Sequence, residues 1–65
     1  MKIQYFQETD TLYIEFKTAD IAESKDLDEN TILDVDQKGN ICGITVEQAS
    51  QRAGIPRFWY EQVAA

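Results

Sequence analysis

The chain has one cysteine and no histidine, so its fold has to be stable without a disulfide or a zinc site. Its 65 residues allow only one domain. A chain of this size buries only about 60% of the surface that its unfolded form exposes. Small domains without cross-links often gain the missing stability by oligomerisation. We therefore expect a single domain, residues 1–65, that forms a homodimer.

The charge of the chain limits its partners. Twelve acidic residues stand against six basic ones, which gives a formal net charge of −6. This balance argues against binding to a phosphate backbone and fits a basic protein partner. The single cysteine is typical of a reducing compartment, and the N-terminus becomes polar after six residues. We expect a cytoplasmic protein without a membrane span.

Apolar residues alternate with polar ones through the first two thirds of the chain. Leu12, Ile14 and Phe16 share one face of a strand, and Cys42, Ile44 and Val46 share one face of another. The pattern predicts a four- to five-stranded antiparallel β-meander over residues 1–46. Residues 21–27 mix charges with apolar residues, which is typical of an edge strand.

The hydrophobic period changes after the last strand. Val46, Ala49, Ser50 and Ala53 follow helical spacing, which predicts a helix over residues 46–53. Gly54 suits the end of this helix, and Pro56 suits the first turn of another, so an aromatic helical tail is expected over 55–65. The predicted class is α+β.

Residues 34–40 raise the question of a calcium loop. Asp34, Asp36 and Gly39 stand where an EF-hand loop needs two ligands and its glycine, but the fifth position is Lys38 and the twelfth is Thr45. Asp36, Gly39 and their neighbours are instead typical of a turn in a β-hairpin. No metal or cofactor is expected here.

With these elements in place, the chain resembles the small bacterial proteins of domain of unknown function 2283 over residues 3–51. The resemblance depends on two motifs, Thr9-Asp10-Thr11-Leu12-Tyr13-Ile14 and the set Asp36, Gly39, Gly43, Ile44, Val46, Ala49 and Ser50. Thr45 departs from the family, which commonly carries glutamate there. The resemblance implies a compact antiparallel sheet with a C-terminal helix. It implies no activity, catalytic residue or cofactor, and it suggests that some members work beside a partner protein.

Groups for catalysis are scarce. Without histidine the usual general base is missing, and we predict no enzyme. Cys42 falls on the inward face of its strand and is expected to be a buried structural thiol. Asp34 and Asp36 point outward, where they could hold a cation weakly if Glu15 lay beside them. Gly43 lies inside a strand, which predicts a bulge or a close backbone approach.

The C-terminal segment carries four residues typical of interface centres, namely Arg57, Phe58, Trp59 and Tyr60. Three consecutive rings on a helix span about 200°, so one small core cannot bury them all. We predict that this segment forms a dimer or partner interface. The alternative is a helix-turn-helix over residues 46–63 that binds DNA as a dimer, although its two arginines are balanced by Glu47 and Glu61.

Overall fold

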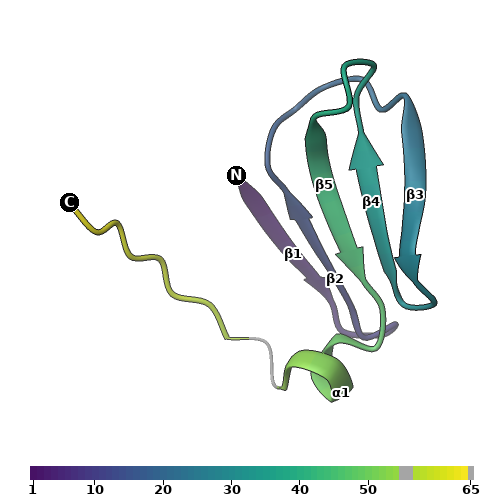
Figure 1. The fold of residues 1–65 in the computed structure, drawn as a ribbon. Coiled ribbons are helices and arrows are strands. Elements are labelled where there is room, and N and C mark those ends of the chain that lie inside the picture. Colours follow the sequence, from purple (N-terminus) through teal and green to yellow (C-terminus); the bar gives the residue numbers. More distant parts are fainter. Residues whose placement is uncertain (55–56, 65) are drawn as a thin grey trace.

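The computed structural model describes residues 1–54 and 57–64, which form one antiparallel sheet and one short helix (Figure 1). The elements are β1 (Lys2–Phe6), β2 (Thr11–Glu15), β3 (Glu23–Asp28), β4 (Thr31–Val35), β5 (Ile41–Val46) and α1 (Ala49–Ala53). The strands lie in the order β1-β2-β5-β4-β3, and every neighbouring pair is antiparallel. The predicted α+β class, the antiparallel sheet and the C-terminal helix are confirmed.

The strand order departs from a sequential meander at one place, because β2 pairs with β5 rather than with β3. The sequence of β5, ICGITV, has no charged residue, whereas β3, ESKDLD, is mostly charged and exposed along its whole length. A central position suits the apolar strand, and an edge suits the charged one. Residues 16–22 connect β2 to β3 across the roughly 14 Å of three strand spacings. The predicted edge strand is thus confirmed: β3 pairs only with β4, whereas a sequential meander would also pair it with β2.

The predicted bulge at Gly43 is confirmed, and the group that approaches this glycine closely is a side chain, not another backbone. Gly43 pairs with Asp34, but the next pair on this ladder joins Ile41 to Val35, so Cys42 is an extra residue on β5 and marks a β-bulge. The Tyr13 ring also lies directly over Gly43, where an added Cβ would come within 2.5 Å of the Tyr13 hydroxyl oxygen. The bulge leaves Cys42 only 1% exposed, as predicted for a structural thiol.

The helix begins later than predicted. Val46 still belongs to β5, where it pairs with Leu12, and Gln48 has a left-handed backbone with φ 54° immediately before α1. Gly54 follows the helix with φ 79°, a conformation that glycine adopts easily, and so fits its predicted role at the helix end.

The predicted helical tail is wrong for residues 57–64, which have no regular secondary structure, while residues 55, 56 and 65 lie outside the described part of the chain. Figure 1 shows this segment standing clear of the sheet. A short segment without packing partners gains too little in water to hold a helix. Within the described residues, no helix has the length and hydropathy needed to cross a membrane.

Candidate protein-binding face

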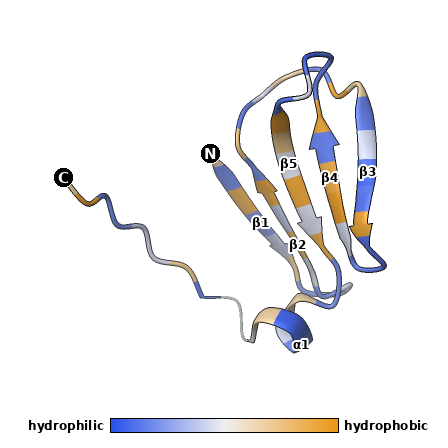
Figure 2. Ribbon diagram, in the orientation of Figure 1, coloured by the Kyte–Doolittle hydropathy of each residue, from blue (hydrophilic) through white to orange (hydrophobic). Residues whose placement is uncertain are grey.

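One face of the sheet carries a row of apolar side chains that spans four strands. The register pairs Ile3 with Ile14, Ile14 with Ile44, and Ile44 with Leu33, and the row ends at Lys25 on β3. Because side chains at paired positions point to the same face, the row is continuous. Figure 2 shows the corresponding contrast, with apolar segments in β2, β5 and β4 and a largely hydrophilic β3. We call Ile3, Ile14, Ile44 and Leu33 the apolar row.

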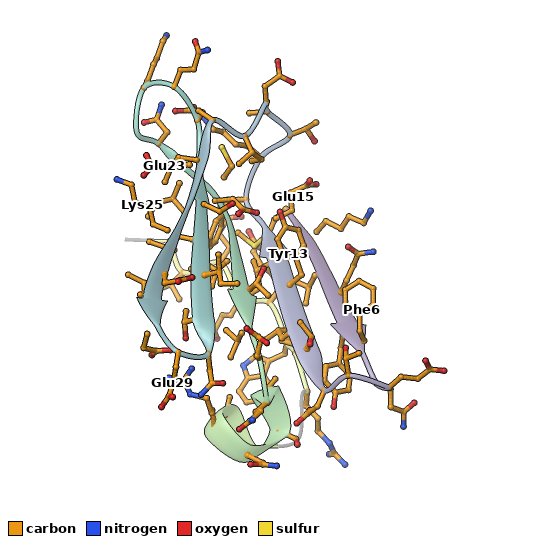
Figure 3. All side chains as sticks on the ribbon, turned by 90° about the vertical axis from the view of Figure 1, so that its right-hand side faces the viewer. Phe6, Tyr13, Glu15, Glu23, Lys25 and Glu29 are labelled. Carbon is orange, nitrogen blue, oxygen red and sulfur yellow. The ribbon has the colours of Figure 1, made fainter. Side chains whose placement is uncertain are left out.

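The apolar row is open to solvent. Ile3 is 43% exposed, and the other three members are half-buried. Among the described residues, the buried apolar side chains are few: Leu12, Val35, Cys42 and Ala49. Helix α1 lies at one end of the sheet, and the described residues place no second layer of secondary structure on either face (Figures 1 and 3). The chain therefore has the inner face of a sandwich without the layer that would cover it.

On the opposite face, the polar side chains of Tyr13, Asp34 and Ser24 form a hydrogen-bonded group beside Gly43. The Tyr13 hydroxyl donates to Asp34 Oδ2 at 3.4 Å, and the Ser24 hydroxyl donates to Asp34 Oδ1 at 2.7 Å. Burial raises the pKa of Tyr13, and the charge of Asp34 adds to the effect. Tyr13 and Glu15 are neighbours on this face of β2 (Figure 3). These hydrogen bonds to Asp34 hold the Tyr13 ring above Gly43.

Asp10 joins the first hairpin to the helix. Its carbonyl accepts the Ala49 amide at 2.8 Å, and its carboxylate accepts the Ser50 amide at 3.0 Å and the Ser50 hydroxyl at 2.7 Å. The Tyr5 hydroxyl donates to the same carboxylate at 2.5 Å. Bonds from Tyr5 and then Ser50 hold the pKa of Asp10 below its ordinary value, and the bond to Asp10 raises the pKa of Tyr5. We call these four residues the Asp10 junction.

The Asp10 junction was not predicted from the sequence. Gln48, the residue at the N-cap position, makes no side-chain capping bond, so the first two amides of α1 depend on Asp10: Ala49 donates to its carbonyl, and Ser50, 40 residues downstream, donates to its carboxylate. Two features of the sequence could have indicated the junction: Gln48, a poor capping residue, precedes the helix, and Asp10 lies in a hairpin turn. A second long-range contact has the same effect at the other end of α1, where Arg52 forms an ion pair with Asp28 at 3.0 Å and donates to the Thr31 hydroxyl at 2.7 Å.

The turn between β4 and β5 is the predicted hairpin turn. Asp36 Oδ1 accepts the amides of Lys38 and Asn40, both at 2.9 Å, and Gly39 has φ 82°. Lys17 from the β2–β3 connection forms an ion pair with Asp36 at 2.9 Å. The Lys17 ammonium, and then the Asn40 amide, hold the pKa of Asp36 far below its ordinary value. These contacts use the carboxylate of Asp36 to hold the turn.

The acid limb of the stability curve follows from these carboxylates. Asp10, Asp28 and Asp36 have lowered pKa values in the fold, so their contribution is complete above the unfolded-state pKa of about 4 and is lost as pH falls below it. We expect the midpoint of urea unfolding to hold between pH 5 and 7 and to fall below about pH 4. Asp36→Asn should lower the midpoint at pH 7 and flatten the acid limb, whereas the exposed Glu29→Gln should leave both as in the wild type. A wild-type slope in Asp36→Asn would contradict this prediction.

The proposed cation face does not form a cluster. Glu15 and Asp34 flank Gly43 on one face, while Asp36 lies in the turn with Lys17. Within residues 1–54 and 57–64, no three side chains of metal-binding type come together.

The predicted interface residues are all exposed in the single chain. Phe58 is 49% exposed, Trp59 87% and Tyr60 83%, and Arg57 is exposed with them. The expectation that the rings cannot all be buried in one small core agrees with these values. Their role as an interface stays a prediction.

The alternative helix-turn-helix has no second helix in the described residues. Helix α1 has five residues, and residues 57–64 are not helical. Arg52, one of the two arginines of the segment, is engaged with Asp28. The described part of the segment therefore lacks the second helix that would present Arg57, Phe58 and Trp59 to a major groove.

Comparison with known proteins places the chain in a family. Residues 2–50 match the family described as protein of unknown function (DUF2283). The chain belongs to this family. No curated protein and no solved structure matches the chain.

The match to DUF2283 spans all five strands and the start of α1, and it ends at Ser50. The two motifs of the family resemblance meet in space, because Asp10 from the first holds Ala49 and Ser50 from the second. In this DUF2283 protein the motifs therefore maintain the fold, and the aromatic segment 57–64 lies beyond the matched residues.

Proposed function

We propose that this DUF2283 protein is a non-enzymatic cytoplasmic module that self-associates through the open face of its sheet and binds a protein partner through its acidic surface. The observation that carries the proposal is the apolar row, which is continuous across four strands, is partly open to solvent, and has no second layer over it among residues 1–54 and 57–64. An exposed apolar patch bordered by polar residues is typical of a protein interaction site.

The chemistry of the remaining side chains supports a binding role rather than catalysis. The Cys42 thiol is 1% exposed, and the carboxylates of Asp10, Asp34 and Asp36 are engaged with neighbouring donors. The net charge of −6 favours a basic protein as the partner.

Matched charge substitutions on β1 test the proposal. Ile3→Glu puts a charge into the apolar row, whereas Phe6→Glu puts the same charge on the opposite face of the same strand, where Phe6 is 48% exposed. Sedimentation velocity over a range of concentrations should show a wild-type dimer that Ile3→Glu weakens by about tenfold or more, while Phe6→Glu stays within a few-fold of the wild type. A wild type that remains monomeric at the highest concentration would remove the proposal.

A further inference from the structure

The segment 57–64 carries the three most exposed aromatic side chains of the described residues, Phe58, Trp59 and Tyr60. Trp59 and Tyr60 are more than four-fifths exposed, and Val63 is 76% exposed. Tyr60 donates to Gln62 within the same segment, at 3.2 Å. The segment leads from the end of α1 into solvent, away from the strands (Figure 1). Aromatic side chains contribute most of their energy when they are buried in a core or an interface, so these rings have surface to gain from contact with another face.

The apolar row and the aromatic segment 57–64 are both exposed apolar surfaces, and each could bury the other. We infer that residues 57–64 of one copy lie across the apolar row of a second copy, and that the second copy returns the same contact. Such an exchange is closed by a two-fold axis, because each copy supplies one sheet face and one segment. This inference depends on the self-association proposed above, and it names the occupant of the open face.

The accessible area of the chain agrees with this arrangement. The single chain exposes 5341 Å², whereas a folded monomer of 7.5 kDa exposes about 4,200 Å². The excess, roughly 1,100 Å², exceeds the approximately 800 Å² per partner that a stable interface of standard size buries. The chain therefore exposes enough surface beyond that of an ordinary folded monomer to form one interface of standard size with a second copy.

The charges near the two surfaces also favour a copy of the same chain over a strongly basic partner at this face. The apolar row ends at Lys25, with Glu23 on the same strand, and the segment carries Arg57 and Glu61. Each of the two surfaces thus carries one positive and one negative side chain. Two chains of charge −6 still repel each other at long range, and salt screens that repulsion. The dimer should therefore strengthen with salt, whereas the binding of a basic partner would weaken.

Trp59 is the only tryptophan and so reports on its own surroundings. In the full-length wild type, its emission should shift to the blue as sedimentation shows the dimer forming, and both changes should strengthen between 50 and 300 mM salt. Trp59→Ala should weaken the dimer by about tenfold or more, which is the effect expected for a central aromatic residue. The control is Gln51→Ala, an exposed change on α1 outside the segment, which should stay within a few-fold of the wild type.

Cysteine pairs separate exchange from a segment that folds back on its own chain. A Phe58→Cys copy is mixed with a size-tagged Ile3→Cys copy, with Cys42 left in its buried position. The mixture should form the disulfide between copies at several times the yield of a control mixture with Phe6→Cys. Equal yields would overturn the inference.

Three other outcomes would also overturn the exchange between copies. A disulfide within single chains of the Ile3→Cys/Phe58→Cys double variant at high dilution would assign the face to the chain's own segment and overturn the exchange. A dimer that survives Trp59→Ala would overturn the exchange and leave self-association standing. A wild-type monomer would remove both proposals.

Discussion

Replacing Asp10 with alanine is expected to lower the melting temperature of the domain by at least about 4 to 8 °C, which corresponds to the loss of one good helix cap in a domain of this size. The substitution removes the carboxylate that accepts the Ser50 amide, the Ser50 hydroxyl and the Tyr5 hydroxyl. Few substitutions at an exposed turn would have an effect this large.

The reason lies in the length of α1. A helix of five residues cannot be stable by itself, so it holds its shape only through contacts at its ends. The N-terminal contact is the Asp10 junction, and the C-terminal contact is the ion pair between Arg52 and Asp28. When the carboxylate is lost, Ser50 loses both of its bonds to Asp10, and the buried Ala49 is left with only its backbone bond to the Asp10 carbonyl.

Amide hydrogen exchange measured by NMR is the sharpest test, because Ser50 donates its amide directly to Asp10. In Asp10→Ala this amide should exchange at least about tenfold faster, while amides between β4 and β5 keep most of their protection. In Asp10→Asn, which keeps an acceptor oxygen but not the charge, the Ser50 amide should exchange at a rate between those of the wild type and Asp10→Ala. Glu8→Ala, an exposed change in the same turn, is the control. Unchanged Ser50 exchange in Asp10→Ala would show that the junction does not hold the helix.

Local chemistry made much of this fold predictable. The alternation of β2 and β5, the charged edge strand β3 and the turn at Asp36 each depend on residues close in sequence, and each was confirmed. Gly43 was predictable for the same reason, because glycine inside an apolar strand has few other uses.

The features that were not predicted depend on distant residues. The pairing of β2 with β5 depends on which strand best fills the centre of the sheet, and the Asp10 junction links positions 40 residues apart. The expected helix at 57–64 followed from composition alone, whereas a helix of that length needs a packing surface. The candidate site was half predicted: the aromatic residues were named from the sequence, but the open face that could receive them became visible only through the register.

Gly43→Ala is expected to destabilise the domain by about 1 to 3 kcal/mol, the range for overpacking a filled site. A Cβ at this position would lie 2.5 Å from the Tyr13 hydroxyl oxygen and 2.9 Å from the ring carbon that bears it. Because β5 is central in the sheet, its backbone cannot easily retreat, so the Tyr13 ring has to move. That movement breaks its bond to Asp34. Urea unfolding at pH 7 measures the loss.

A double-mutant cycle shows whether the Tyr13 ring is the cause. In a Tyr13→Ala background, the space above position 43 is free, and the added methyl group only restricts the unfolded chain and favours the strand. Gly43→Ala should then be neutral or stabilising by up to about 1 kcal/mol. The sign of the same substitution therefore reverses with the residue at position 13, and the coupling between the two sites should be about 1 to 3 kcal/mol. If Gly43→Ala cost the same with and without the ring, the backbone at the bulge rather than Tyr13 would be what requires glycine.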